Sequence, residues 1–123
     1  MSCNLLIVDD SPTEVHSLRA MLERNGFNVD SAANGEEGIE KAKSSHPDLI
    51  LMDIVMPGMN GFQATRRLAK DAKTADIPVI IVSTKGQETD VVWGKRQGAR
   101  DYVIKPINEQ DLIQRVNTML GST

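Results

Sequence analysis

Short apolar runs alternate along the chain with longer segments in which apolar residues recur at helical spacing. The runs predict five strands, at residues 5–8, 28–32, 48–53, 77–83 and 102–104. Continuous apolar strands are typical of a parallel sheet that is buried on both faces. The run 28–32 is more polar than the others, which is typical of an edge strand.

The segments between the runs predict five helices. The first begins with a capping-box pattern, Ser11 and Glu14, and has Pro12 at the favoured first helical position. The others lie at residues 35–45, around the apolar positions 62, 65, 68 and 69, at 88–97, and around 112, 116, 119 and 120. Strands that alternate with helices imply right-handed βαβ units. The predicted fold class is therefore α/β, a doubly wound parallel sheet covered on both faces.

Length and composition indicate one ordinary domain over residues 1–123, with no separate output domain. A net charge of −3 argues against general nucleic-acid binding. The longest apolar runs have four residues, too few for a membrane span. The single cysteine excludes an internal disulfide framework, and no dinucleotide-binding glycine motif follows the first strand. We therefore expect a cytoplasmic domain without an organic cofactor.

Chemically active side chains stand where the predicted strands end. Asp9 and Asp10 follow the first strand, Asp53 the third, Ser83 the fourth and Lys105 the fifth. In an open parallel sheet the carboxyl ends of the strands line the crevice in which ligands bind. The sequence therefore brings three carboxylates, one hydroxyl and one ammonium group to one place.

Three carboxylates at close range repel one another unless a cation is present, and Lys105 alone does not balance them. Mg²⁺ takes one or two carboxylates and keeps several waters, so it suits this set. Lys105 and Ser83 then suit the oxygens of a transferring phosphoryl group. Asp53, in the middle, is placed to act as the carboxylate nucleophile.

These residues resemble those of response-regulator receiver domains of the chemotaxis CheY type, over essentially the whole chain. The matching motifs are Asp9-Asp10 after the first strand, Asp53 followed by Met56-Pro57-Gly58, Ser83 after the fourth strand, and Lys105-Pro106 after the fifth. The resemblance implies a flavodoxin-like, five-stranded sheet in the order 2-1-3-4-5. It also implies that Asp53 is the phosphoacceptor.

The resemblance assigns roles to further residues. Mg²⁺ would be bound directly by Asp10, through water by Asp9, and by the backbone carbonyl of Val55. Ser83 and Lys105 would hold the phosphoryl oxygens, and the bond between Lys105 and Pro106 would be cis. Tyr102 would be a switch that turns inward when Ser83 moves toward the phosphoryl group.

Two segments narrow the resemblance, and two residues depart from the common pattern. Residues 11–14 and 87–102 are similar to twitching-motility regulators of type IV pilus chemosensory systems. Thr84 stands where the family usually has a smaller side chain, which narrows access to the site. Val55 is apolar and does not position an attacking water, so the lifetime of an aspartyl phosphate stays open.

Three apolar residues in a row, Val91-Val92-Trp93, cannot all face the inside of one helix. They form either a wide buried stripe or part of a surface that binds a partner. Aromatic and arginine side chains are enriched in binding hot spots, which favours the second interpretation. The predicted partner surface comprises Val91, Trp93, Lys95, Arg96 and Tyr102.

The leading hypothesis is a stand-alone, monomeric receiver that is not an enzyme. It takes a phosphoryl group from a CheA-like sensor histidine kinase and signals to a downstream protein of the pilus or motility machinery.

One alternative is a phosphate sink for a shared kinase, and another is a binding module that needs no phosphorylation. A third is a magnesium-dependent phosphatase of the haloacid-dehalogenase type. That class uses two aspartates separated by one residue and usually a cap domain, and this sequence has adjacent Asp9 and Asp10.

Overall fold

The strands form one parallel sheet in a computed structural model that describes residues 3–121. The strands are β1 (Asn4–Val8), β2 (Asn28–Ala32), β3 (Leu49–Met52), β4 (Val79–Ser83) and β5 (Asp101–Ile104). Their spatial order is β2-β1-β3-β4-β5, which confirms the expected topology. The polar strand β2 lies at an edge, as its composition predicted.

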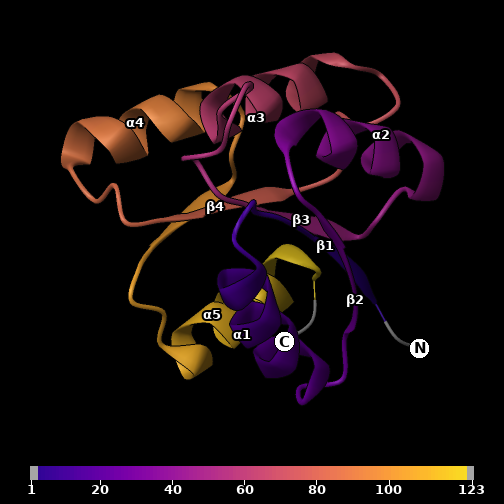
Figure 1. The fold of residues 1–123 in the computed structure, drawn as a ribbon, viewed down its shortest axis with the longest axis vertical. Coiled ribbons are helices and arrows are strands. Elements are labelled where there is room, and N and C mark those ends of the chain that lie inside the picture. The colour runs from indigo at the N-terminus through magenta and orange to yellow at the C-terminus, as the bar shows by residue number, and fades with distance from the viewer. Residues whose placement is uncertain (1–2, 122–123) are drawn as a thin grey trace.

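Helices cover both faces of this sheet. They are α1 (Pro12–Glu23), α2 (Gly35–Ser45), α3 (Gly61–Lys70), α4 (Glu88–Arg96) and α5 (Glu109–Met119). Figure 1 shows α2, α3 and α4 in one layer and α1 and α5 on the opposite face. The doubly wound α/β fold is therefore confirmed.

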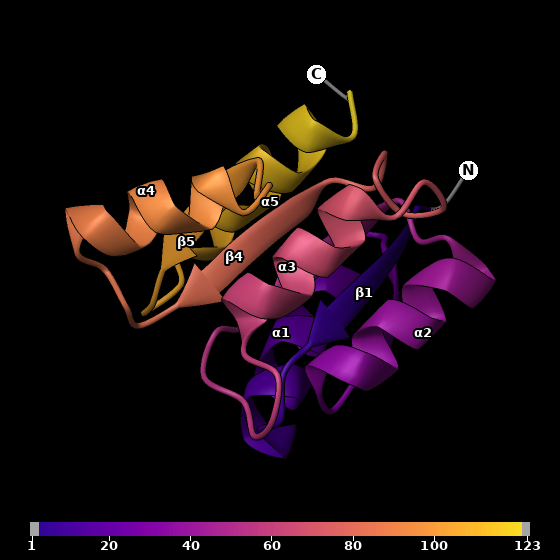
Figure 2. The ribbon, with the colours of Figure 1, turned by 90° about the horizontal axis from the view of Figure 1, so that it is seen from above.

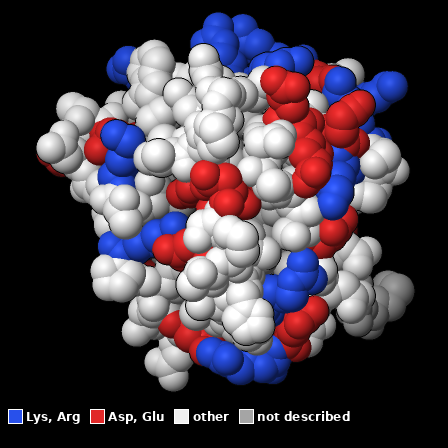
Figure 3. Space-filling model, in the orientation of Figure 1, with Lys and Arg blue, Asp and Glu red and all other residues white. Residues whose placement is uncertain are grey.

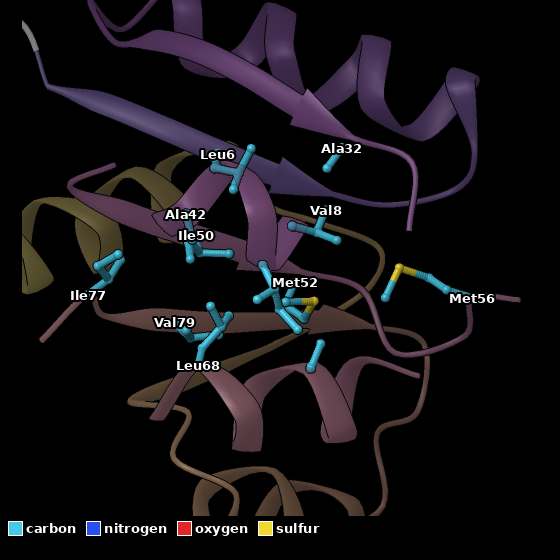
Figure 4. Close-up of a cluster of buried hydrophobic side chains, with 12 residues drawn as sticks. Leu6, Val8, Ala32, Ala42, Ile50, Met52, Met56, Leu68, Ile77 and Val79 are labelled. Atoms are coloured by element: carbon cyan, nitrogen blue, oxygen red, sulfur yellow. The ribbon is translucent and has the colours of Figure 1, made fainter. Parts of the chain in front are cut away.

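Alternate residues of each central strand supply two separate hydrophobic clusters. Leu6 and Val8 of β1 point toward α2 and α3, in a cluster that Figure 4 shows together with Ile50, Met52 and Leu68. Leu5 and Ile7 belong to the cluster on the α1 and α5 side. This alternation follows from the two-residue period of a strand, and it explains why the strands are apolar throughout.

The start of α1 differs from the predicted capping box. The Ser11 side chain accepts a hydrogen bond from the Glu14 N–H at 3.3 Å, as expected of an N-cap. The Ser11 N–H, however, donates to Asp9 Oδ1 at 3.0 Å and not to Glu14. Only half of the capping box forms, because a carboxylate at the end of β1 takes the place of the Glu14 side chain.

The parallel strands bring the loops that follow them to one edge of the molecule. Figure 2 shows β1 and β4 pointing in the same direction, with the chain leaving both at the same edge. Residues that come directly after strands therefore meet there. No helix among residues 3–121 has the length and apolar character needed to cross a membrane.

Candidate functional site

Three carboxylates converge at the carboxyl edge of the sheet. Asp9 follows β1 and Asp53 follows β3, and the pairing of Val8 with Met52 sets the two side by side. One carboxylate oxygen from each of Asp9, Asp10 and Asp53 lies within 4.8 Å of the others. Figure 3 shows acidic side chains gathered near the centre of this face, around the passage from β1 to α1. The predicted acidic cluster is therefore present.

Lys105 reaches this cluster from the end of β5. Its Nζ lies 3.7 Å from Asp9 Oδ2 and 3.7 Å from Asp53 Oδ1. The Lys105 N–H donates to the Ser83 carbonyl at 2.9 Å, which fixes the lysine beside β4. The bond between Lys105 and Pro106 is cis, as the resemblance implied.

The charge of Lys105 does not neutralise the carboxylates. Burial, followed by the like charge of Asp9, raises the pKa of Asp53 to about 6. Burial is also the largest cause of the raised pKa of Asp9, against the opposing hydrogen bond from Ser11 and the charge of Lys105. For both carboxyls, the effect of burial and like charge on the pKa outweighs the opposing charge of Lys105. A hard divalent cation with oxygen ligands fits this donor set.

Ser83 is buried at the end of β4 and connects the site to β5. Its Oγ accepts a hydrogen bond from the Lys85 N–H at 3.1 Å. The Lys85 carbonyl in turn accepts a hydrogen bond from the Tyr102 hydroxyl. The backbone of Lys85 therefore joins the two residues that were predicted to form the switch.

Tyr102 points into the molecule. Its side chain is 6% exposed and packs in a cluster with Ile54, Ile81 and Ala99. Residue 54 directly follows Asp53, so this cluster lies beside the candidate site. An inward tyrosine matches the orientation that the resemblance gives to the switched state.

The predicted partner surface divides into exposed and inward residues. Trp93 is 51% exposed, and Lys95 and Arg96 are exposed. Val91 is only partly exposed and packs against the Tyr102 cluster. Tyr102 is buried and Val91 is only partly exposed, so both contribute less to this surface than the other three residues, and their role in partner binding stays a prediction.

Sequence reasoning missed two residues of the site. Glu14 Oε2 lies 3.5 Å from Lys105 Nζ, so a third carboxylate competes for the lysine. Its position in the first turn of α1, four residues after Asp10, was the available signal. Gly61 meets the site through its backbone, since a Cβ there would lie 2.0 Å from the Asp53 carbonyl oxygen. Its N–H donates to the Ile54 carbonyl at 2.9 Å, and only the folded structure reveals this approach.

Sequence comparison places this geometry among known proteins. Residues 5–117 match the family model of the response regulator receiver domain. The chain is 62% identical to the protein PilH of Pseudomonas aeruginosa over 117 residues, which cover 95% of this chain and 97% of PilH. This match confirms the resemblance to twitching-motility regulators that residues 11–14 and 87–102 indicated. The chain also matches longer transcriptional regulators, and it spans about half of their length.

Solved structures agree with the sequence matches. The receiver domain of a sensor histidine kinase from Pseudomonas aeruginosa, crystallised with a magnesium ion coordinated in its active site cleft, superposes with a TM-score of 0.91 at 27% identity. That match covers 99% of this chain and 100% of the other. A chain of the CheX–CheY complex with BeF3 and magnesium from Borrelia burgdorferi gives a TM-score of 0.88 at 34% identity, with 94% and 87% covered. The chain belongs to the response regulator receiver domain family.

Proposed function

We propose that Asp53 accepts a phosphoryl group from a phosphohistidine of a CheA-like sensor kinase, and that the phosphorylated domain signals by binding another protein. One observation carries this proposal. The Asp53 carboxylate is grouped with those of Asp9 and Asp10 within 4.8 Å and lies 3.7 Å from Lys105 Nζ. The group combines a nucleophile, ligands for a cation and a positive charge for phosphoryl oxygens.

Magnesium fits the donor set of this site. Asp9, Asp10 and Asp53 would hold it through their carboxylates, and Val55 through its backbone carbonyl. A magnesium ion held there would neutralise negative charge on the phosphoryl oxygens. The raised pKa values of Asp9 and Asp53 support this assignment, because they show that negative charge is held there at a cost.

The residues of the chain then perform the transfer. An Asp53 carboxylate oxygen forms a bond to phosphorus while the bond from phosphorus to the histidine nitrogen breaks. The bonding electron pair returns to the leaving imidazole. Lys105 Nζ binds one phosphoryl oxygen, and the Ser83 hydroxyl donates a hydrogen bond to another.

Two hydrogen bonds of the Lys85 backbone, in the loop after β4, supply a route for the signal. A phosphoryl group that draws the Ser83 hydroxyl toward itself breaks the bond from the Lys85 N–H to Ser83 Oγ. The Lys85 carbonyl also holds the Tyr102 hydroxyl, so the change reaches the residue beside α4. Trp93 and Arg96 on α4 form the surface that reads this change.

Similarity to PilH over 97% of that protein supports the remaining assignments. We infer a single-domain, monomeric, cytoplasmic regulator of type IV pilus or related motility that is not itself an enzyme. A downstream protein target receives the signal. A phosphate sink shares all the chemistry above and differs only in lacking such a target.

The test is intact mass after incubation with Mg²⁺ and acetyl phosphate, with Asp53→Asn as the matched control. We expect one phosphoryl adduct on the wild type that requires Mg²⁺ and is absent from the variant. An adduct that persists in Asp53→Asn contradicts the assignment of the acceptor. Partner capture with and without the adduct then separates a messenger, whose partners change, from a sink, whose partners do not.

A further inference from the structure

Positive charge is concentrated on one side of an acidic protein. The whole chain has fourteen lysine and arginine residues against seventeen aspartate and glutamate residues. Residues 61–76 and 88–100, which contain α3 and α4, have seven against four. Figure 3 shows lysine and arginine side chains along the upper rim, over α3.

The basic residues of this region are not occupied by carboxylates of the chain. Arg66, Lys70 and Arg96 are exposed and form no ion pair with any residue in the part of the chain that the structure describes. The two nearby carboxylates after α3 are engaged elsewhere, Asp71 with Lys43 and Asp76 with His46. The positive charge is therefore available to a partner.

Two large apolar side chains lie beside this charge. Val92 and Trp93 are each 51% exposed, and they line one depression on the surface of α4 together with Arg96, Thr89 and the acidic Glu88. These residues follow the inward-facing Val91, so the excess apolar residues of the helix are on its outside. Exposed aromatic and aliphatic side chains next to arginine are typical of a binding hot spot.

Helical geometry places Trp93 on the side of α4 that faces α3. Gly94 is the buried residue of α4 and faces Ile81 and Tyr102. In a right-handed crossover, the residue before Gly94 turns toward α3 and the residue after it toward β5. Trp93 therefore faces α3, whereas Lys95 faces β5.

Arg66 lies on the matching edge of α3. Phe62 packs in the cluster that α4 also contacts, and Ala69 Cβ would lie 2.7 Å from a Cβ placed at Gly98. These residues mark the side of α3 toward α4. Arg66 comes one turn after Phe62 and about one turn before Ala69, so it borders the α3–α4 boundary alongside Trp93.

We propose that this α3–α4 face, defined by Arg66, Lys70, Val92, Trp93 and Arg96, docks an acidic amphipathic helix of a partner protein. The partner's apolar side chains cover Val92 and Trp93, and its carboxylates meet the three basic residues. Complementary charge then sets specificity and the rate of encounter. This docking goes beyond the phosphorylation chemistry, since none of these residues contacts the acidic site.

A protein partner fits the face better than nucleic acid or an anionic membrane. Both alternatives present negative charge over an area wider than this face, so they would also meet the acidic remainder of a protein whose net charge is −3. Nucleic acid offers no aliphatic side chains, and a membrane surface offers no fixed pattern of apolar and acidic groups. A helix with one acidic and one apolar face offers both.

The test uses the fluorescence of Trp93, the single tryptophan of the chain. The unphosphorylated protein is titrated with a synthetic helical peptide of glutamate and leucine, about 18 residues or five turns long, which carries no aromatic residue. We expect the Trp93 emission to shift to shorter wavelength with saturation. A peptide with glutamine in place of glutamate is expected to bind about tenfold more weakly, because the charged pairs are lost.

Charge reversal locates the binding face. Arg66→Glu combined with Arg96→Glu is expected to weaken peptide binding at least about tenfold. Lys95→Glu reverses one charge on the same helix but toward β5, and it is expected to change binding less than about twofold. Circular dichroism confirms that each variant is folded.

Three results would overturn the proposal. The first is unchanged Trp93 emission up to millimolar peptide, and the second is an equal loss of binding in Lys95→Glu. The third is an equally strong shift with phosphatidylglycerol vesicles or duplex DNA in the same salt. None of these outcomes bears on Asp53, because no phosphoryl donor is present.

Discussion

Two carboxylates in different parts of the fold, Asp53 and Glu109, each lie beside one basic side chain, and yet their pKa values are shifted in opposite directions. The pKa of Asp53 is raised to about 6, whereas that of Glu109, at the start of α5, is lowered to about 2. The number of neighbouring charges explains the difference. Asp53 shares Lys105 with Asp9 and Glu14, and burial adds to the cost of its charge.

Within residues 3–121, Glu109 does not share its hydrogen-bond partners with another carboxylate. Arg24 Nε donates to both of its oxygens, at 3.1 and 3.0 Å, and Asn25 Nδ2 donates to Oε2 at 2.9 Å. The Glu109 side chain is 35% exposed, so its charge is also partly solvated. Glu109 thus has a complete set of interactions within the chain. The site around Asp53 is incomplete without a cation, and this is the physical mark of a place that binds one.

The largest effect is expected when Asp53 loses its charge, because this removes the difference between an unbalanced carboxylate at Asp53 and a paired one at Glu109. Asp53→Asn is expected to raise the stability of the metal-free protein at neutral pH by on the order of 2 kcal/mol, because a charge held at a raised pKa is removed. The same variant is expected to lose most of the stabilisation that Mg²⁺ gives the wild type. Urea unfolding with EDTA or Mg²⁺ measures both effects. Glu40→Gln, on the exposed side of α2, is the control, and an equal gain from it would contradict the prediction.

The dependence of stability on pH in the metal-free protein is expected to show the free-energy cost of ionising Asp53. A carboxyl with a raised pKa in the folded state holds its proton longer than in the unfolded state, so stability falls as pH rises from about 4 to about 6. Asp53→Asn is expected to flatten this part of the profile. Mg²⁺ is expected to reduce the fall in stability of the wild type. Thermal melts across this range test the sign. If the stability of the wild type rises with pH as steeply as that of the variant, the raised pKa of Asp53 is refuted.

A smaller effect is expected from the carboxylate that competes for the lysine. Glu14→Gln leaves Lys105 with two carboxylates in place of three, which strengthens its interaction with phosphoryl oxygens at Asp53. Because Glu14 is about half exposed, we expect about a twofold increase in the rate of phosphorylation by acetyl phosphate. Glu23→Gln, at the far end of the same helix, is the control. A slower rate in Glu14→Gln would show that Glu14 positions the lysine productively.

The smallest effect on stability is expected at Glu109, whose carboxylate is hydrogen-bonded by Arg24 and Asn25. Glu109→Gln is expected to lower the melting temperature slightly at neutral pH, since the ionised form is the one that Arg24 and Asn25 hold. A lowered pKa gives stability that is present above about 4.5 and is lost as pH falls toward about 2. The difference between variant and wild type should therefore shrink across that range. A difference that is constant with pH would assign the effect to packing.

The sequence predicted the fold and the main site because both depend on periodic or terminal features of strands. Continuous apolar runs revealed a sheet buried on both faces, and the residues directly after them had to meet at one edge. Asp9, Asp53 and Lys105 were found in this way. The order of strands and the cis bond before Pro106 came from the family resemblance, because local pattern does not encode them.

The sequence could not reveal features that depend on how separate elements face each other. Val91 and Trp93 are similar in character, and only the packing of α4 turns one inward and the other outward. The sequence pattern predicts Glu14 only as a capping residue, whereas the structure places its side chain beside Lys105. Contacts of this kind link residues far apart in the chain, and a local pattern gives no measure of their distance.

The close approach of Gly61 to Asp53 has a consequence for how this domain can diversify. The helix α3 meets the backbone of Asp53 at a position that bears no side chain. The outward residues of α3 can therefore be exchanged freely during evolution or in a designed library, and new partners acquired, while Gly61 is kept. Variation of binding specificity is in this way separated from the chemistry that all such variants would share.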